Sequence, residues 1–241
     1  NGLGPVLAIF MEKGWFTHLA TNGAGIIHDW EFSFLGSSCE DVETNTARGE
    51  FGNWSETGFY INLALIVGAY EGLGYGESIG AMIEREELTI PAEDDLVACC
   101  REAVENDPER AAAAADLLWA VRRFELPAGL LAIRHPWKRF SAQAAAFRLG
   151  VPFTGHPMIG HDIIYNHPMN HCASLGRCAE RDFLTYAQNV SQIDGGVYLS
   201  IGSAVMSPMI FEKSLSMAQN MALRRGKAIE NHAIFVVDLA E

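Results

Sequence analysis

Basic residues are scarce in this chain. Its 241 residues include 17 lysines and arginines against 30 aspartates and glutamates, which gives a formal net charge of −13. A surface of that charge repels the phosphates of nucleic acids and the headgroups of anionic membranes. We therefore expect neither a nucleic acid nor a membrane as a partner.

Long apolar runs are also missing, although 49% of the residues are hydrophobic. No run reaches the length that crosses a bilayer, and the first residues do not read as a secretory signal peptide. A chain of this length and apolar content buries one sizeable core. We expect a single α/β domain over residues 1–241.

Cysteines are few, and their number is odd: Cys39, Cys99, Cys100, Cys172 and Cys178. An odd set with two adjacent members is not a disulfide framework, which favours the reducing cytoplasm. We expect Cys99 and Cys100 to pack in a helical region, and Cys172 and Cys178 to serve as packing residues.

The apolar pattern alternates short strands with helices. Strands are expected at 15–20, 130–133, 151–154, 196–201 and 233–239, and helices at 5–13, 26–35, 56–72, 74–86, 92–105, 107–123, 141–149, 179–193 and 206–225. Alternation of this kind is typical of a doubly wound, mostly parallel sheet. The fold class is therefore α/β.

Two stretches depart from this alternation of strands and helices. Residues 36–54 are polar and are expected to form a long loop, which in a compact domain is usually functional or disordered. Several consecutive helices then form a helical insertion at about 55–124. Further along, Glu180, Arg181 and Asp182 are expected on a solvated helix face.

Three turns follow predicted strands: 21–25, 155–172 and 202–207. The carboxyl ends of parallel strands lie at one edge of a sheet, which is where open α/β sheets bind ligands. Gly23 and Gly25 allow a tight turn and a close backbone approach, and the helix that follows them favours an anion. The alternative is a tight turn with no ligand.

The second of these turns is unusually rich in titratable groups. Its members are His156, His161, Asp162, His167 and His171. Histidine and aspartate suit zinc or another divalent first-row metal, although the spacing fits no tight signature. Alternatively, His161 or His28 beside an aspartate acts as a base near neutral pH. In a third interpretation, Asp162 and His167 only hydrogen-bond the loop backbone.

Three stretches resemble deoxyhypusine synthases, in the same order along the chain. Thr21–Asp29 resembles their Thr-Ala-Gly-Gly-Val-Glu-Glu-Asp stretch. Gly160–His167 is similar to their Leu-Gly-Asp-Met-Ile-Phe-Phe-His stretch and matches it at Asp162, Ile164 and His167. Gly202–Val205 is similar to their Gly-Gly-Gly-Val-Val turn, again before a long helix. The resemblance covers the α/β parts and not the helical insertion.

The resemblance implies a Rossmann-like fold, an NAD site along the glycine-rich turns and a homotetramer with sites at subunit interfaces. In that family, NAD oxidises spermidine and an aminobutyl group passes through an enzyme lysine. Carried over by position, the residues that would touch or shape the NAD site are Thr21, Asn22, Gly23, Gly25, Asp29, Gly202, Ser203 and Ala204. Asp162 would match the carboxylate near the polyamine.

The chain also departs from that pattern. Ile27 and His28 stand where the family has two glutamates, and Ser207-Pro208 stands where it has Lys-His. A second resemblance is to the His-Asp-Ile-Glu stretch of an archaeal NAD-dependent ornithine cyclodeaminase domain, which matches His28, Asp29 and Glu31. This resemblance also implies oxidation of an amine by hydride transfer.

We therefore expect a deoxyhypusine synthase-like NAD-dependent enzyme that acts on an amine, polyamine or amino-acid-like substrate, with or without group transfer. Its catalytic residues would be His28, His161, Asp162 and His167, with His161 or His28 as the proton acceptor and Asp29 or Asp162 as the ammonium ligand. The alternatives are a metal-dependent hydrolase that uses the 156–171 loop, and a non-catalytic dinucleotide-binding protein.

Overall fold

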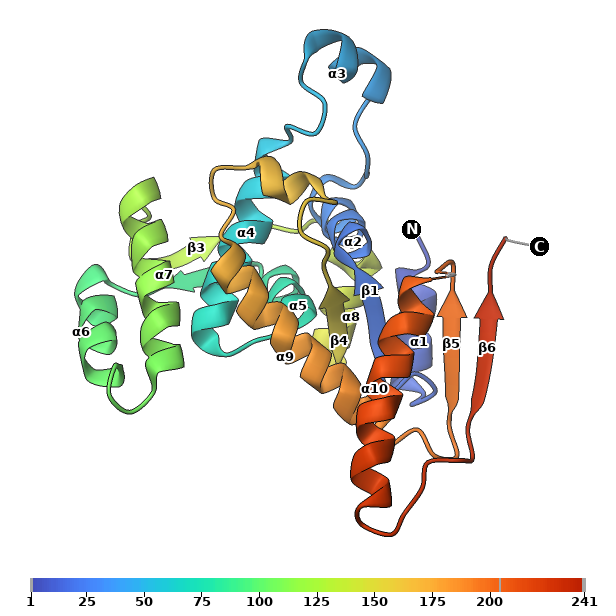
Figure 1. Ribbon diagram of the computed structural model, residues 1–241. Helices are drawn as coiled ribbons and strands as arrows, with labels where there is room; N and C mark the ends of the chain where they lie inside the picture. The colour runs from blue at the N-terminus through green and yellow to red at the C-terminus, as the bar shows by residue number, and fades with distance from the viewer. Residues whose placement is uncertain (1, 204, 240–241) are drawn as a thin grey trace. The chain divides into compact units, whose positions relative to one another are not determined.

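The chain folds as an α/β protein with small sheets (Figure 1). A computed structural model describes residues 2–203 and 205–239. They divide into two compact units, Asn1–Asp182 and Phe183–Glu241, which we call the N-terminal and C-terminal units. The expectation of one domain over residues 1–241 stays a prediction.

The N-terminal unit is mostly helical. Its helices are α1 (Gly4–Glu12), α2 (Gly23–Leu35), α3 (Val42–Arg48), α4 (Ser55–Glu71), α5 (Tyr75–Arg85), α6 (Glu93–Ala103), α7 (Pro108–Phe124), α8 (Ala142–Leu149) and the first part of α9 (Cys172–Val190), with short 3₁₀ helices η1 (Lys138–Phe140) and η2 (Ile163–Asn166). Its strands are β1 (Leu19–Asn22), β2 (Glu87–Ile90), β3 (Gly129–Ala132) and β4 (Phe153–His156). The four helices expected at about 55–124 are present, and β2 lies among them.

The strands pair in twos within the described residues. β1 runs parallel to β4, with Asn22 opposite His156, so the turns after these two strands lie side by side. β3 pairs antiparallel with β2 instead of joining a parallel sheet. β2 lies in the short gap between two expected helices and was not expected from the sequence. The interpretation of the apolar run 130–133 as a strand of a parallel sheet was wrong.

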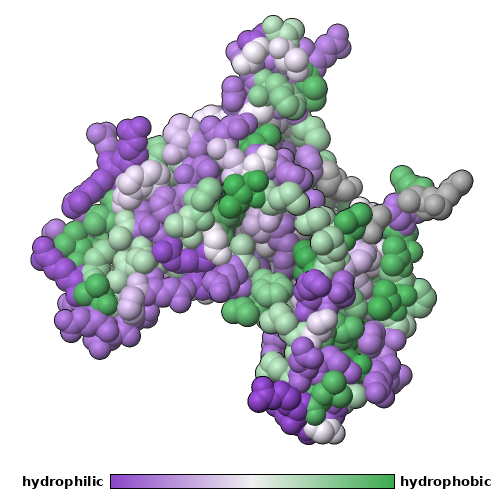
Figure 2. Space-filling view, in the orientation of Figure 1, coloured by the Kyte–Doolittle hydropathy of each residue, from purple (hydrophilic) through white to green (hydrophobic). Residues whose placement is uncertain are grey.

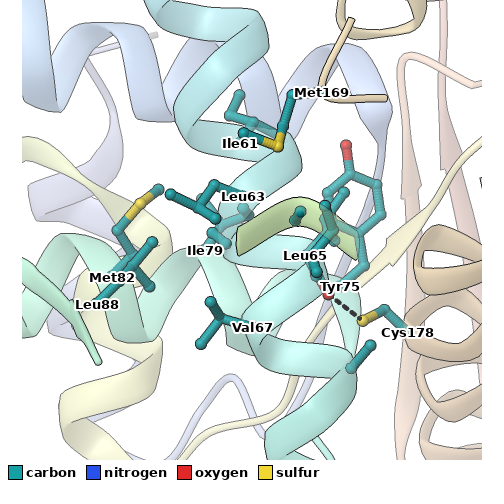
Figure 3. Packing of buried hydrophobic residues seen from close by; sticks show 14 of the residues in the cluster. Ile61, Leu63, Leu65, Val67, Tyr75, Ile79, Met82, Leu88, Met169 and Cys178 are labelled. Carbon is teal, nitrogen blue, oxygen red and sulfur yellow. Dashed lines mark hydrogen bonds between the residues drawn. The ribbon is translucent and has the colours of Figure 1, made fainter. Parts of the chain in front are cut away.

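The core of this unit forms around α4, whose residues Ile61–Ala69 are buried on every side. Helices α2, α5 and α7 surround it with apolar side chains such as Trp30, Ile79 and Leu117. Figure 3 shows part of this packing, in which the Cys178 thiol donates a hydrogen bond to the Leu65 carbonyl oxygen at 3.4 Å. Cys178 is thus a packing residue, as expected, whereas Cys172 is exposed.

A buried carboxylate ties α9 to the start of α5. Asp182 is only 3% exposed, and its Oδ2 accepts hydrogen bonds from the backbone N–H groups of Gly76 (2.9 Å) and Gly155 (2.5 Å). The expectation of a solvated face at this position was wrong. The run of charged residues 180–182 suggested a solvated helix face, but the backbone donors to Asp182 come from elements more than 20 residues away.

Local sequence determines where several of these helices begin and end. Asn22 caps α2 by accepting from the Gly25 N–H, and Gly36 ends the helix in the left-handed conformation. Asp107 caps α7, with Pro108 in the first turn. Ser141 caps α8 in the same way.

The expected loop at 36–54 contains a short helix. α3 projects from the body of the N-terminal unit on two extended segments (Figure 1) and buries no residue.

Figure 2 shows hydrophilic residues over the α6 and α7 region, where Glu93, Asp94 and Asp95 form the first turn of α6. None of the described helices is long and apolar enough to cross a membrane.

The C-terminal unit combines the end of α9 with β5 (Val197–Ile201), α10 (Met206–Leu223) and β6 (Ala233–Val237). β5 runs parallel to β6, with Val197 opposite Ala233. Tyr186, Val190 and Phe211 form its small core, and the Tyr198 ring stacks on Phe211 at 4.1 Å. The strand, small-residue turn and long helix expected here are therefore present.

Candidate functional site

The parallel pairing of β1 and β4 places Asp162 against the start of α2. A Cβ added to Gly23, the first residue of that helix, would overlap the Asp162 carboxylate. Glycine at this position therefore makes room for a side chain of the chain itself. An anionic group at a helix N-terminus is favourable, because the first backbone N–H groups carry partial positive charge.

The surroundings of Asp162 are polar but poorly paired. Burial raises the pKa of its carboxyl group, and the nearby His161 and His28 oppose that shift. Tyr75 and Tyr165 interact electrostatically with the same carboxylate. Neither phenol oxygen has a hydrogen-bond partner in the described part of the chain, although both are buried. We call Tyr75, Asp162 and Tyr165, with His28 and His161, the Asp162 cluster.

The two phenols of the cluster are uncharged near neutral pH. Burial raises the pKa of Tyr165 to about 12 and that of Tyr75 well above its usual range. In Figure 3 the Tyr75 hydroxyl points away from Cys178. A buried hydroxyl without a partner loses the hydrogen bonds it would make to water. Both groups therefore favour a polar ligand atom beside the Asp162 carboxylate.

A cavity of about 450 Å³ lies on an adjoining face of α2. That volume falls within the range of small-molecule sites. Three of the residues expected at the dinucleotide site line it: Thr21, Gly25 and Asp29. The remaining lining residues are mainly apolar or aromatic: Gly2, Leu3, Gly4, Leu7, Leu19, Ala20, Phe32, Gly36, Trp137, Phe140, Ala142 and Phe153.

Local structure already engages the polar atoms of this group. The Asn22 side chain caps α2 by accepting from the Gly25 N–H at 2.9 Å. A Cβ at Gly25 would overlap the Thr21 hydroxyl. The Asp29 carboxylate binds the first turn of α8, where it accepts from the Ala142 N–H at 2.9 Å. These residues shape the cavity, and the Asp29 carboxylate stabilises α8.

The second glycine-rich turn belongs to the C-terminal unit. Gly202 has a φ of +69° and donates its N–H to the Val237 carbonyl at 2.8 Å. The Ser203 hydroxyl accepts from the Ser207 N–H at 3.0 Å, next to the start of α10. Ala204 lies outside the described residues.

The histidines of the 155–172 stretch do not converge. His156 bonds the Thr154 hydroxyl at 3.0 Å, and burial lowers its pKa to about 4. His171 bonds the Ser174 hydroxyl at 3.1 Å. No group of three or more His, Cys, Asp or Glu side chains in residues 2–203 and 205–239 is arranged to hold a metal ion.

His167 packs on the first turns of α4. A Cβ at Gly58 would lie 2.6 Å from the His167 Cβ, and the Phe59 ring meets the imidazole edge-on at 6.0 Å. The His167 Nδ1 accepts from the Met169 N–H at 3.0 Å. Within the described chain, no hydrogen bond or ion pair joins His167 to Asp162. The geometry matches the interpretation of His167 as a residue that orders the loop backbone.

His28 meets groups that the sequence pattern did not bring together. Its Nδ1 hydrogen-bonds the Ser38 hydroxyl and lies 3.7 Å from the Glu31 Oε2 and 3.9 Å from the Cys39 Sγ. Ser38 and Cys39 belong to the polar 36–54 segment, whose length was the only signal of function. Tyr165 lies inside the histidine-rich stretch, three residues after Asp162, but only the histidines and the aspartate of that stretch were expected as site residues.

Comparison with known proteins identifies no relative. No family model matches the chain, and neither the curated proteins nor the solved structures contain a match.

Proposed function

We propose that this chain is a deoxyhypusine synthase-like, NAD-dependent enzyme that oxidises an amine. The observation that carries the proposal is the juxtaposition at α2. One face of the helix lines an aromatic cavity, and the Asp162 cluster lies at its N-terminus and on an adjoining face. A dinucleotide with a small amine beside it requires neighbouring sites of these two kinds.

The cavity suits the base and ribose of a nucleotide. Phe32, Trp137 and Phe140 offer flat apolar surfaces, and Thr21 and Gly25 bring polar groups to one end. Aromatic rings stack on bases of any sequence. When bound, NAD supplies the hydride acceptor. The partial positive charge at the start of α2 favours the charge of its pyrophosphate.

The Asp162 cluster suits the amine. The carboxylate attracts an ammonium group, and the oxygens of Tyr75 and Tyr165 accept hydrogen bonds from its N–H donors. His28 or His161 takes the proton that the amine releases before oxidation. His28 is 36% exposed, so its ring reaches solvent and passes the proton on.

We extend the proposal to the rest of the family resemblance. The two parallel strand pairs belong to a Rossmann-like, doubly wound fold. Within the C-terminal unit, Gly202 and Ser203 form a second turn of the dinucleotide-binding type. The chain assembles as a homotetramer in the cytoplasm. The sedimentation velocity of the purified protein tests the tetramer directly.

NAD binding is expected to depend on the cavity. Ala20→Trp places a large ring in it from an exposed position of β1, and should weaken the Kd for NAD at least about ten-fold. Ala132→Trp is the matched control, because Ala132 is exposed on β3 and does not line the cavity. Isothermal titration calorimetry measures both variants. Equal affinities would remove the cavity from the dinucleotide site.

Amine turnover is expected to require Asp162. Asp162→Asn keeps the size of the side chain but removes the charge that holds an ammonium group, so kcat/KM for the best polyamine or basic amino acid should fall about 10²-fold or more. NADH absorbance follows the reaction, and NAD affinity should stay within about two-fold. A wild-type protein that binds NAD and oxidises no amine would be a non-catalytic dinucleotide-binding protein.

A further inference from the structure

The segment after α2 brings a thiol, a hydroxyl and a carboxylate around one imidazole nitrogen. The His28 Nδ1 bonds the Ser38 hydroxyl and lies 3.9 Å from the Cys39 Sγ and 3.7 Å from the Glu31 Oε2. Cys39 is exposed, so its sulfur is open to a reactant. An accessible thiol beside a base that a third group orients is the arrangement of an activated nucleophile.

Glu31 gives this group its charge. Its side chain is only 2% exposed, and its carboxylate accepts from the Thr57 hydroxyl at 3.1 Å and from the Ser38 hydroxyl at 3.2 Å. No lysine or arginine forms an ion pair with it in the described part of the chain; His28 lies within ion-pair distance. The Glu31 carboxylate therefore faces the Nδ1 of His28 from a fixed position and orients the imidazole beside Cys39.

The backbone holds Cys39 in an uncommon conformation. Its φ is +72°, and the other described non-glycine residues with positive φ, Glu86 and Glu125, each end a helix. Cys39 ends no helix, and its N–H donates to the Glu31 Oε2 at 3.4 Å. Such a conformation is unfavourable for a residue with a side chain and persists where surrounding contacts impose it.

Neighbouring groups indicate what reactant this thiol would meet. The Asp162 carboxylate interacts electrostatically with His28, and the Tyr75 hydroxyl beside Asp162 is fully buried without a partner in the described chain. A cationic amine held there brings the other end of a short molecule toward His28.

We propose that Cys39 is a nucleophile, with His28 as its base and Glu31 as the residue that positions His28, and that it adds to the carbonyl carbon of a small aminoaldehyde. The reactive thiol does not depend on the dinucleotide. The identity of the aldehyde rests on the proposed function, because amine oxidation followed by hydrolysis of the imine yields an aldehyde.

The addition is balanced without a further reactant. The sulfur forms a bond to the carbonyl carbon, the C–O π bond breaks, and the thiol proton passes through His28 to the oxygen. The product is a hemithioacetal, and nothing is oxidised or reduced. The reverse step releases the aldehyde and restores the thiol.

The reactivity of the thiol is measured on the intact protein with iodoacetamide and peptide mass spectrometry. His28→Asn is expected to slow alkylation of Cys39 about ten-fold at neutral pH while Cys172, also exposed, changes by less than about two-fold. Glu31→Gln, which removes the charge only, should slow Cys39 in the same direction. Circular dichroism verifies the fold of each variant. An unchanged Cys39 rate in a folded variant of either kind overturns the proposal.

The electrophile is tested by protection. Aminopropanal, with its amine at the far carbon, should protect Cys39 from iodoacetamide at lower concentration than uncharged propanal, and Asp162→Asn should abolish the difference. No protection by either aldehyde overturns the carbonyl step. NAD titration of the same samples tests the proposed function separately, since a protein that fails to bind NAD can still show the reactive thiol.

Discussion

Replacing Asp182 with alanine is expected to lower the free energy of unfolding of the N-terminal unit by about 3 kcal/mol. The side chain satisfies the N–H groups of Gly76 and Gly155, and both donors stay buried when the carboxylate is removed. Hydrogen exchange at these two amides is the specific measurement. Wild-type protection of both amides in the alanine variant would contradict the anchoring role of Asp182.

The same carboxylate makes stability depend on pH. Burial raises the pKa of Asp182 from its ordinary value of 3.8 to about 7, against the lowering effect of the N–H groups of Gly155, Gly76 and Tyr75. Between these values the folded chain binds more protons than the unfolded chain. Its contribution to stability is therefore greatest at low pH and falls as pH rises from about 4 to about 7, by about 2 to 4 kcal/mol.

Three partly or fully buried histidines act in the opposite direction over part of that range. Burial lowers the pKa of His18, His135 and His156 from 6.5 to about 4, so their contribution to stability rises with pH in this window. The contributions of these histidines cancel in the difference in stability between wild type and Asp182→Asn, because both proteins contain them. We expect wild type to lose stability relative to this variant as pH rises toward 7, as measured by urea unfolding. A pH-independent difference would place the Asp182 pKa near its ordinary value.

The positions of helices were readable from the sequence, but the pairing of strands was not. Caps such as Asp107 and Gly150 act within one turn, so short stretches predict them. The pairing of β3 depends on Glu87–Ile90, about 40 residues earlier, and its antiparallel direction leaves no local signal. The expected alternation of strands and helices was correct in kind, whereas the pairing of β1 with β4 comes from the structure alone.

Backbone turns bring several residues of the expected site together, and the roles of these residues stay predictions. Thr21, Gly25 and Asp29 do line a cavity, and Asp162 does meet the start of α2. Tyr75 was missed because only the packing of α5 brings its hydroxyl near Asp162. Asp182 was misjudged for the same reason, since burial at that position comes from distant backbone.

Two glycine-to-alanine substitutions in helices are expected to change stability in opposite directions. Gly76 lies in the first turn of α5, where an added Cβ would overlap the Phe153 carbonyl oxygen and lie 2.7 Å from its carbonyl carbon. Backbone atoms of β4 cannot rotate away as a side chain does. Gly76→Ala must therefore shift α5 or β4 and strain the hydrogen bond to Asp182, at a cost of about 3 kcal/mol.

Gly176 is the matched control in α9. It is exposed, and an added Cβ would meet nothing within 4 Å. Gly176→Ala should stabilise the chain by about 1 kcal/mol, because alanine loses less conformational entropy than glycine on helix formation. Urea unfolding followed by circular dichroism compares the two variants. Stabilisation by Gly76→Ala would show that α5 does not rest against β4, and the position of Gly155 and the Asp162 stretch after it would then need another support.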